Sequence, residues 1–238
     1  MDFADIIASS IGYVALAFLP PICWLLIYLR EDRHPEPKHL IALTFIGGIG
    51  SALVALAAER ALLFGLDPEK QFIIFFAAIA LIEEYVKYLS VKLTALHRLD
   101  FNEPIDAMIY MVTAGLGFAA IENVLFLFIQ VYDAKLLLGV NLLAGVQLSA
   151  ARFISANLLH ALASAIVGYF LARAWFHPLR KHLIAIGIVC AAILHVTFDY
   201  LIMNKDILPG GTAYIAALLG LALVFVLIDF HKLKKENP

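Results

Sequence analysis

The chain has 238 residues, of which 63% are hydrophobic and only 15% charged, and its mean hydropathy is +0.92. Soluble domains carry about a quarter charged residues, so this composition excludes an ordinary soluble protein and predicts a polytopic membrane protein. The formal net charge is −2 and no large basic patch occurs, so we expect no nucleic-acid partner.

Apolar runs long enough to cross a bilayer recur seven times along the chain. A hydrocarbon core about 30 Å thick needs about 20 apolar residues in helical form, and a helix satisfies its own backbone hydrogen bonds in lipid. The sequence therefore predicts an all-α transmembrane bundle of about seven spans, forming one membrane-embedded domain over residues 1–238. The predicted spans cover approximately residues 6–29, 39–65, 71–96, 105–131, 148–175, 183–203 and 213–231.

Local features refine three of these segments. The first run has no basic residues before it, so we expect it to remain as a span and not to be cleaved as a signal peptide, and Pro20 and Pro21 should kink it. The weakly apolar segment 132–147 is expected to form an interfacial or re-entrant helix. Cys23 and Cys190 lie inside apolar runs and are predicted to be buried thiols without a disulfide.

Lysines and arginines are distributed unequally between alternate connections, and cytoplasmic loops carry the excess of these residues. Eleven flank the first, third and fifth connections and the C-terminal tail, whereas five flank the second, fourth and sixth. This asymmetry predicts an N-terminus outside and a C-terminus in the cytoplasm. The eleven are Arg30, Arg33, Lys38, Lys92, Arg98, Arg173, Arg180, Lys181, Lys232, Lys234 and Lys235, and the five are Arg60, Lys70, Lys135, Arg152 and Lys205.

The third predicted span contains three ionisable residues within one and a half helical turns, Glu83, Glu84 and Lys87. Placing one charge at the centre of a bilayer costs at least about 2.5 to 3.5 kcal/mol on insertion scales. Lys87 lies four residues after Glu83 and three after Glu84, so a salt bridge within the helix is the simplest explanation. One lysine neutralises only one carboxylate, so the second needs a proton, a cation or water.

Ionisable side chains also lie deep in three other predicted spans. Glu83, His160 and His195 each follow the start of their span by about twelve residues, which is a similar depth at about 1.5 Å per residue. Glu122 lies near the middle of the fourth span, slightly toward its outer side. We therefore expect a polar cluster shared by four helices in the interior of the bundle.

The two deep histidines have simpler structural explanations as well. His195 and Asp199 are four residues apart and could bond to each other, holding neighbouring helices together. Asn157, three residues before His160, could orient that imidazole or bond to a nearby backbone group.

The fourth span allows similar alternatives. Glu122 and Asn123 could cap a helix break or bridge to Lys87. The small residues of segment 114–120 are typical of close helix packing, and its G-x-G is no nucleotide signature because no strand precedes it.

The combination of deep residues nevertheless favours a chemical site. Two neutral imidazoles with carboxylates form a ligand set for Zn2+ or a similar divalent ion. A further carboxylate outside that set is the general base that a water molecule needs in hydrolysis. The sequence therefore predicts a metal site, with Zn2+ as the expected cofactor.

Four motifs, in order, resemble those of the PrsW-type intramembrane proteases. Residues 83–87 match E-E-x-x-K, and residues 106–123 resemble a second motif around G-F-A-x-x-E-N. His160 and the H-x-x-x-D of His195 and Asp199 match the later motifs. This group is related to the CAAX prenyl endopeptidases and the bacteriocin-processing membrane proteases, whose first motif is E-E-x-x-x-R. The similarity covers residues 80–202, within a motif-bearing core of residues 71–203.

The resemblance implies a role for each residue of these motifs. Glu83 and Glu84 would supply the base that activates water, with Lys87 as their counter-ion. Glu122 stands where the CAAX relatives carry a histidine, so the number and identity of the metal ligands stay open. The candidate catalytic residues are Glu83, Glu84 and Lys87, the candidate metal-binding or water-positioning residues are Glu122, His160 and His195, and the candidate supporting residues are Asn123, Asn157 and Asp199.

The same resemblance implies an intramembrane endopeptidase in a bacterial cytoplasmic membrane, which cuts a membrane-anchored protein such as an anti-sigma factor. The main alternative from the residues alone is a proton- or ion-coupled transporter, which uses midplane acids and histidines equally well. No inverted repeat supports that alternative. A bis-histidine haem protein and a catalytically silent membrane adaptor are the remaining alternatives.

Overall fold

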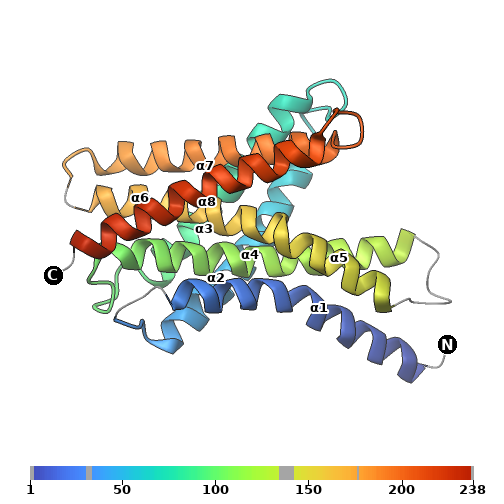
Figure 1. Cartoon of the computed structure of the whole chain (residues 1–238), viewed down its shortest axis with the longest axis horizontal. Coiled ribbons are helices and arrows are strands. Elements are labelled where there is room, and N and C mark those ends of the chain that lie inside the picture. Colours follow the sequence, from blue (N-terminus) through green and yellow to red (C-terminus); the bar gives the residue numbers. More distant parts are fainter. Residues whose placement is uncertain (1–2, 31–33, 134–141, 176, 237–238) are drawn as a thin grey trace.

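The computed structural model describes residues 3–30, 34–133, 142–175 and 177–236, and in these ranges the chain forms eight helices and no strand. The predicted all-α architecture is confirmed (Figure 1). The helices are α1 (Phe3–Leu29), α2 (Lys38–Leu62), α3 (Phe72–Thr94), α4 (Pro104–Asp133), α5 (Leu142–Ile154), α6 (Ala156–Ala174), α7 (Arg180–Met203) and α8 (Gly211–Glu236).

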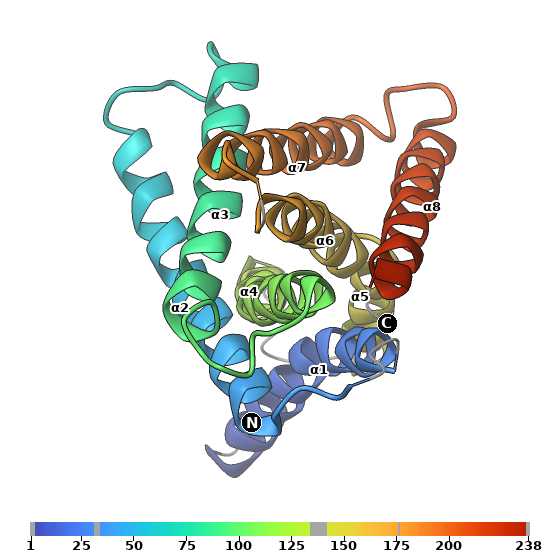
Figure 2. The ribbon, with the colours of Figure 1, turned by 90° about the vertical axis from the view of Figure 1, so that its left-hand side faces the viewer.

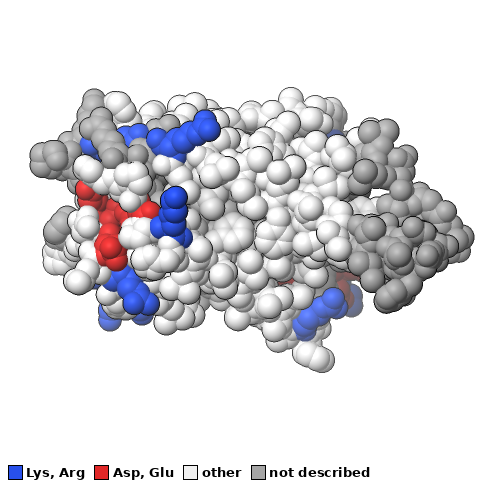
Figure 3. Space-filling model, turned by 90° about the horizontal axis from the view of Figure 1, so that it is seen from below, with Lys and Arg blue, Asp and Glu red and all other residues white. Residues whose placement is uncertain are grey.

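Six segments within the described helices are long and apolar enough to cross a membrane, and they include parts of every helix except α3. Helix α3 has 23 residues, which at about 1.5 Å per residue also matches a bilayer core, but its centre carries the Glu83, Glu84 and Lys87 cluster. Figure 3 shows charged side chains at either end of a broad uncharged band. The chain is therefore an integral membrane protein in which α3 carries three of the deep ionisable groups.

The fifth predicted span, residues 148–175, is confirmed as a candidate span over Ser149–Ala174, but two helices make it up instead of one. Helix α5 begins earlier, at Leu142, and the helix is interrupted at Ser155 before α6 begins. Side chains satisfy backbone groups at the break, because Ser155 Oγ donates to the carbonyl of Ala151 at 2.8 Å and Asn157 Nδ2 donates to the carbonyl of Arg152 at 2.7 Å. The segment 132–147, predicted as interfacial or re-entrant, falls partly in residues 134–141, which lie outside the described residues.

Two other local predictions have clear outcomes. Pro20 and Pro21 lie inside α1, which continues through them, and Figure 1 shows that helix changing direction along its length. Cys23 and Cys190 are free, as predicted, but neither is buried within the protein. Exposed apolar side chains are expected on the outer surface of a bundle that faces lipid.

Helices α4 and α6 form the centre of the bundle. In the end-on view of Figure 2, α4 is surrounded by α1, α2, α3 and α6, and the most extensive packing joins α4 to α6. Small residues permit this close approach, because a Cβ atom at Gly115 would lie 2.9 Å from the carbonyl oxygen of His160 and would also strike Ser164. The glycines of segment 114–120 therefore serve helix packing, as predicted, with Gly115 against α6 at His160 and Gly117 against Phe45 of α2.

Replacing Gly115 with valine should lower the stability of the bundle by about 1 to 3 kcal/mol, because the added methyl groups overlap α6. Gly50→Val is the matched control, since Gly50 is also helical but nothing lies within 4 Å of the place that a Cβ atom would take there. Thermal unfolding in detergent measures the difference. Equal unfolding temperatures for the two variants would show that the contact between α4 and α6 is not tight.

Candidate active site

Helix α3 presents Glu83, Glu84 and Lys87 toward the interior, and all three residues are at most 4% exposed. Helical spacing places the lysine beside both acids, with Nζ at 2.8 Å from Glu84 Oε1 and 3.4 Å from Glu83 Oε2. Tyr85, on the other face of the helix, is 52% exposed. The salt bridge expected from the sequence is present, and it is shared between the two carboxylates.

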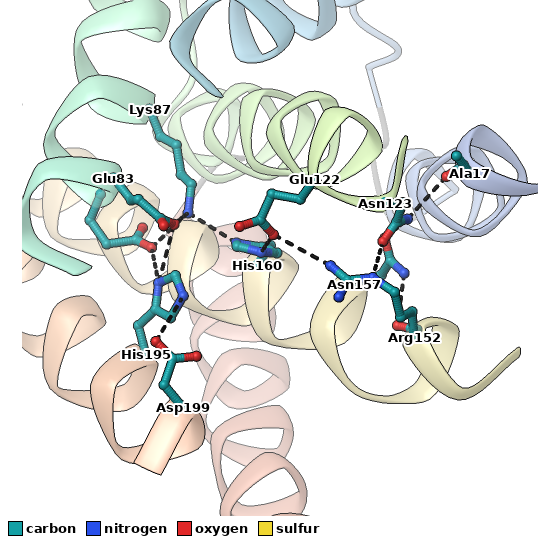
Figure 4. A network of polar contacts seen from close by, with 11 residues as sticks. Ala17, Glu83, Lys87, Glu122, Asn123, Arg152, Asn157, His160, His195 and Asp199 are labelled. Atoms are coloured by element: carbon teal, nitrogen blue, oxygen red, sulfur yellow. Dashed lines mark hydrogen bonds and ion pairs between the residues drawn. The ribbon is translucent and has the colours of Figure 1, made fainter. Parts of the chain in front are cut away.

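His195 of α7 lies against the same two acids (Figure 4). Its Nδ1 atom is 3.1 Å from Glu84 Oε1 and 3.7 Å from Glu83 Oε2. Its other ring nitrogen, Nε2, faces Asp199 Oδ2 at 3.8 Å, which is an ion-pair distance and too long for a direct hydrogen bond. Asp199 therefore lies beside His195, where the sequence placed it, without bonding to it directly.

His160 of α6 joins the acid cluster to α4. Its Nδ1 atom is 3.0 Å from Lys87 Nζ, and its Nε2 atom is 2.5 Å from Glu122 Oε2. A charged lysine can only donate, so Nδ1 accepts from Lys87 and Nε2–H donates to Glu122. Lys87 thus uses three donors on Glu83, Glu84 and His160, and its ammonium also lies 4.2 Å from the centre of the Phe118 ring.

The structure brings together all nine candidate residues of the sequence prediction, from α3, α4, α6 and α7 (Figure 4). Asn123 Nδ2 donates to Asn157 Oδ1 at 2.9 Å and to the carbonyl oxygen of Ala17 in α1 at 3.0 Å. The two asparagines therefore tie α4, α6 and α1 together beside the cluster. Among the described contacts, neither asparagine forms a hydrogen bond with His160. A direct hydrogen bond therefore does not support the suggestion that Asn157 orients this imidazole.

Arg152 of α5 is the main member of the network that the sequence reasoning did not single out. Its Nη2 atom is 3.5 Å from Glu122 Oε2, its Nε atom donates to Asn123 Oδ1, and its guanidinium carbon lies 4.6 Å from the centre of the Phe126 ring. In the sequence it was counted as a flank of a connection. An arginine inside an apolar run of span length was the available signal.

A cavity of about 420 Å3 opens beside the histidines, between α4, α5, α6 and α7, and we call it the large cavity. Its volume lies within the range of about 300 to 1,000 Å3 that is typical of ligand sites. Its polar lining residues are Glu122, Arg152, Ser155, His160, His195, Asp199 and Lys205, and apolar side chains such as Phe126, Leu159, Phe198 and Ile202 make up most of the rest. A peptide segment with apolar side chains fits both its size and its walls.

The donor set and the charge balance are compatible with a divalent metal. One ligand atom from each of Glu83, Glu84, His160 and His195 can be chosen so that all four lie within 4.8 Å of one another. A tetrahedral Zn2+ ion holds its ligands about 3.4 Å apart, so these groups would have to draw closer and Lys87 Nζ, which contacts three of them, would have to move aside. Glu84 Oε2 is buried without a hydrogen-bond partner among the described residues, which leaves a lone pair free for a cation.

The formal charge of the cluster is also compatible with a divalent metal. Four carboxylates, those of Glu83, Glu84, Glu122 and Asp199, belong to the cluster. Among the described ion pairs, their permanently charged partners are Lys87 and Arg152, and their other partners are His160 and His195. With neutral histidines, the cluster has a formal charge of −2. A divalent cation would balance it in a low-dielectric interior, where an uncompensated charge is costly.

Glu122 stands apart from the four residues whose ligand atoms converge. The sequence named it as a candidate ligand, but its carboxylate bonds to His160 Nε2–H, and its side chain is 30% exposed. A carboxylate behind a histidine commonly fixes the imidazole so that the other nitrogen can bind a metal. In this arrangement His160 Nδ1 faces the cluster, and it would be available to a metal once Lys87 Nζ, which donates to it at 3.0 Å, moved aside.

If the site cuts proteins, as the sequence resemblance implies, Arg152→Ala should lower kcat/KM by about tenfold to a hundredfold, because it leaves Glu122 and Asn123 without a charged hydrogen-bond partner at the cavity wall. Arg152→Lys should recover only part of this, since an ammonium cannot donate in the planar geometry of guanidinium. Arg180→Ala, at an exposed position, is the control. Equal kcat/KM values for Arg152→Ala and Arg180→Ala would show that Arg152 does not contribute to the site.

Comparisons with known proteins agree with this site. Residues 36–228 match the model of the PrsW family of intramembrane metalloproteases. The chain is 26% identical over 223 residues to Protease PrsW of Oceanobacillus iheyensis, which covers 93% of this chain and 94% of that protein. It is also 27% identical over 186 residues to Protease PrsW of Geobacillus kaustophilus, with 75% and 74% covered, and 24% identical over 181 residues to that of Bacillus subtilis, with 74% and 75% covered. No solved structure matches the chain.

Proposed function

This chain belongs to the PrsW family of intramembrane metalloproteases, and from that premise we propose that it uses a divalent metal, with Glu83 as general base, to cut a membrane-anchored protein. The family makes the chain an intramembrane peptidase and does not favour the transporter alternative. The observation that carries the proposal is the convergence of Glu83, Glu84, His160 and His195 in one buried cluster beside the large cavity.

His160, His195 and Glu84 are the residues that would hold the metal. His195 Nδ1 and Glu84 Oε1 already lie 3.1 Å apart, close to the spacing of two ligands on one ion. Glu122, which bonds to His160, would fix that ring, and Asp199 would support His195 by charge from 3.8 Å. When bound, a divalent metal such as Zn2+ supplies a Lewis acid that polarises the peptide carbonyl.

The protein's own side chains would carry the protons of hydrolysis. Glu83 takes a proton from water, the water oxygen bonds to the carbonyl carbon, the C–N bond breaks and the leaving amine takes the proton. Lys87 holds a positive charge between the two glutamates, 3.4 Å from Glu83 and 2.8 Å from Glu84, so it stabilises their ionised forms and the negative charge that develops nearby. The apolar walls of the large cavity would hold an unwound stretch of the substrate's membrane segment.

The substrate class can be tested by comparing membrane-protein fragments in cells that contain either the wild-type protein or Glu83→Gln. We expect fragments that are cut within or beside a single membrane span, an anti-sigma factor among their parents, to be present with the wild type and absent with the variant. The same set of fragments in both cells would contradict the proposal.

A further inference from the structure

A second cavity reaches the buried cluster on its α2 side. It lies between α2, α3 and α4, has a volume of about 50 Å3, and is called the small cavity here. Ala55, Leu56 and Glu59 of α2 line one wall, and Glu83 of α3 and Glu122 of α4 line the other side. Glu122 also lines the large cavity, so the two cavities adjoin at this residue.

The volume of the small cavity limits what it can hold. One water molecule needs about 10 to 15 Å3 of probe-occupied volume and two to four polar partners. A cavity of about 50 Å3 with three carboxylates, Glu59, Glu83 and Glu122, can therefore hold a few waters. It is too small for a peptide, which fits the large cavity of about 420 Å3.

The residues of α2 define a path along one face of that helix. Ala52, Ala55, Leu56 and Glu59 are spaced by three and four residues, so their side chains share one face. Glu59 lies three residues before the end of α2 at Leu62 and is partly exposed, whereas Ala52 and Ala55 are buried at 4% and 2% exposure. The path thus begins near the helix end, where bulk water is close, and leads about 10 Å inward at about 1.5 Å per residue.

We propose that the small cavity is the entry route for the water consumed in hydrolysis, and that Glu59 is a positioning residue that holds water at its mouth. In this proposal the substrate enters by the large cavity and water by the small cavity, and the two cavities adjoin at Glu122. The expected effect of blocking the small cavity on kcat rests on the proposed hydrolytic function. The presence of water in the small cavity does not depend on that function.

The wetting of the cavity can be measured by thiol labelling in membranes. In a background with Cys23→Ala and Cys190→Ala, Leu56→Cys should react with a charged, water-soluble methanethiosulfonate reagent. Val54→Cys is the matched control, because Val54 lies on the same helix and is 57% exposed but on a face that lipid covers. Faster labelling of Leu56→Cys than of Val54→Cys is the expected result, and equal or slower labelling would overturn the proposal.

Blocking the cavity tests its use by the enzyme. Ala55→Leu places three extra carbons in the small cavity and should lower kcat by about tenfold or more with little change in KM, because water delivery acts after substrate binding. Glu59→Leu should act in the same direction with a smaller effect. Ala57→Leu, on the same helix but away from the small cavity, is the control and should cleave like the wild type.

The two measurements separate the possible failures. Labelling of Leu56→Cys in a protein that cleaves nothing would contradict the proposed function and leave the wet cavity standing. Labelling together with an unchanged kcat in folded Ala55→Leu would overturn the water route while leaving the proposed function intact. Leu56→Trp replaces Ala55→Leu as the blocking variant if the latter does not accumulate in the membrane.

Discussion

Glu83→Gln should lower the rate of substrate cleavage by about a hundredfold to ten-thousandfold, the usual contribution of a general base. The glutamine keeps the size of the side chain but cannot take a proton from water. Glu83 is suited to the role because it faces the small cavity, lies 3.7 Å from His195 Nδ1 and is the more distant of the two glutamates from Lys87.

Cleavage of a co-expressed single-span protein is measured by the appearance of its fragments. Glu69→Gln, on an exposed connection between α2 and α3, is the matched control and should cleave normally. Membrane insertion of each variant is checked by its abundance in the membrane fraction. Normal cleavage by an inserted Glu83→Gln protein would show that this carboxylate is not the base.

His160→Ala/His195→Ala should remove the bound metal, from about one ion per chain to almost none, because two of its proposed ligands are lost. Glu84→Gln should also lose metal, since this residue contributes the free Oε2 atom of the cluster. Glu83→Gln should retain the metal while losing activity, and this contrast distinguishes a ligand from a base.

Elemental analysis of the purified proteins measures these contents. His39→Ala is the control, because His39 is exposed at the start of α2 and does not belong to the group of converging ligand atoms. Metal retained in full by the double histidine variant would contradict the proposed ligand set. An active wild-type protein that contains no metal would instead favour a mechanism driven by the glutamates alone.

The sequence predicted the class of fold and the members of the cluster because both depend on strong, local signals. Long apolar runs identify spans regardless of how they pack, and ionisable residues inside them are costly enough to stand out. Equal depth in four runs then sufficed to predict that Glu83, Glu122, His160 and His195 meet, and the contacts in Figure 4 confirm this.

The connections between these residues could not be predicted, because they depend on rotation of each helix about its axis and on side-chain geometry. Depth alone does not tell that Glu122 bonds to His160, or that Lys87 is shared by two acids and an imidazole. The break at Ser155 was missed because its signal is a pair of side-chain to backbone hydrogen bonds and no proline or glycine marks it. Arg152 lies three residues before Ser155, near the end of α5, and from there it contacts Glu122 and Asn123.

The predicted orientation, with the N-terminus outside and the C-terminus in the cytoplasm, stays a prediction from loop charges. It determines from which compartment the small cavity would take water. Glu59 lies near the end of α2 that precedes the second connection, which the charge asymmetry places outside. We therefore expect the Leu56→Cys thiol to react with an impermeant reagent added from the outer side.

The central claim is that the buried glutamate and histidine cluster hydrolyses a peptide bond within the membrane. Its most direct test is cleavage of a single-span protein by the purified protein in liposomes prepared in water enriched in oxygen-18, with mass spectrometry of the fragments. We expect the wild-type protein to give a fragment whose new C-terminal carboxylate carries an oxygen atom from the solvent, and Glu83→Gln to give no fragment. An intact substrate with the wild type, or equal amounts of fragment from both proteins, would contradict the central claim.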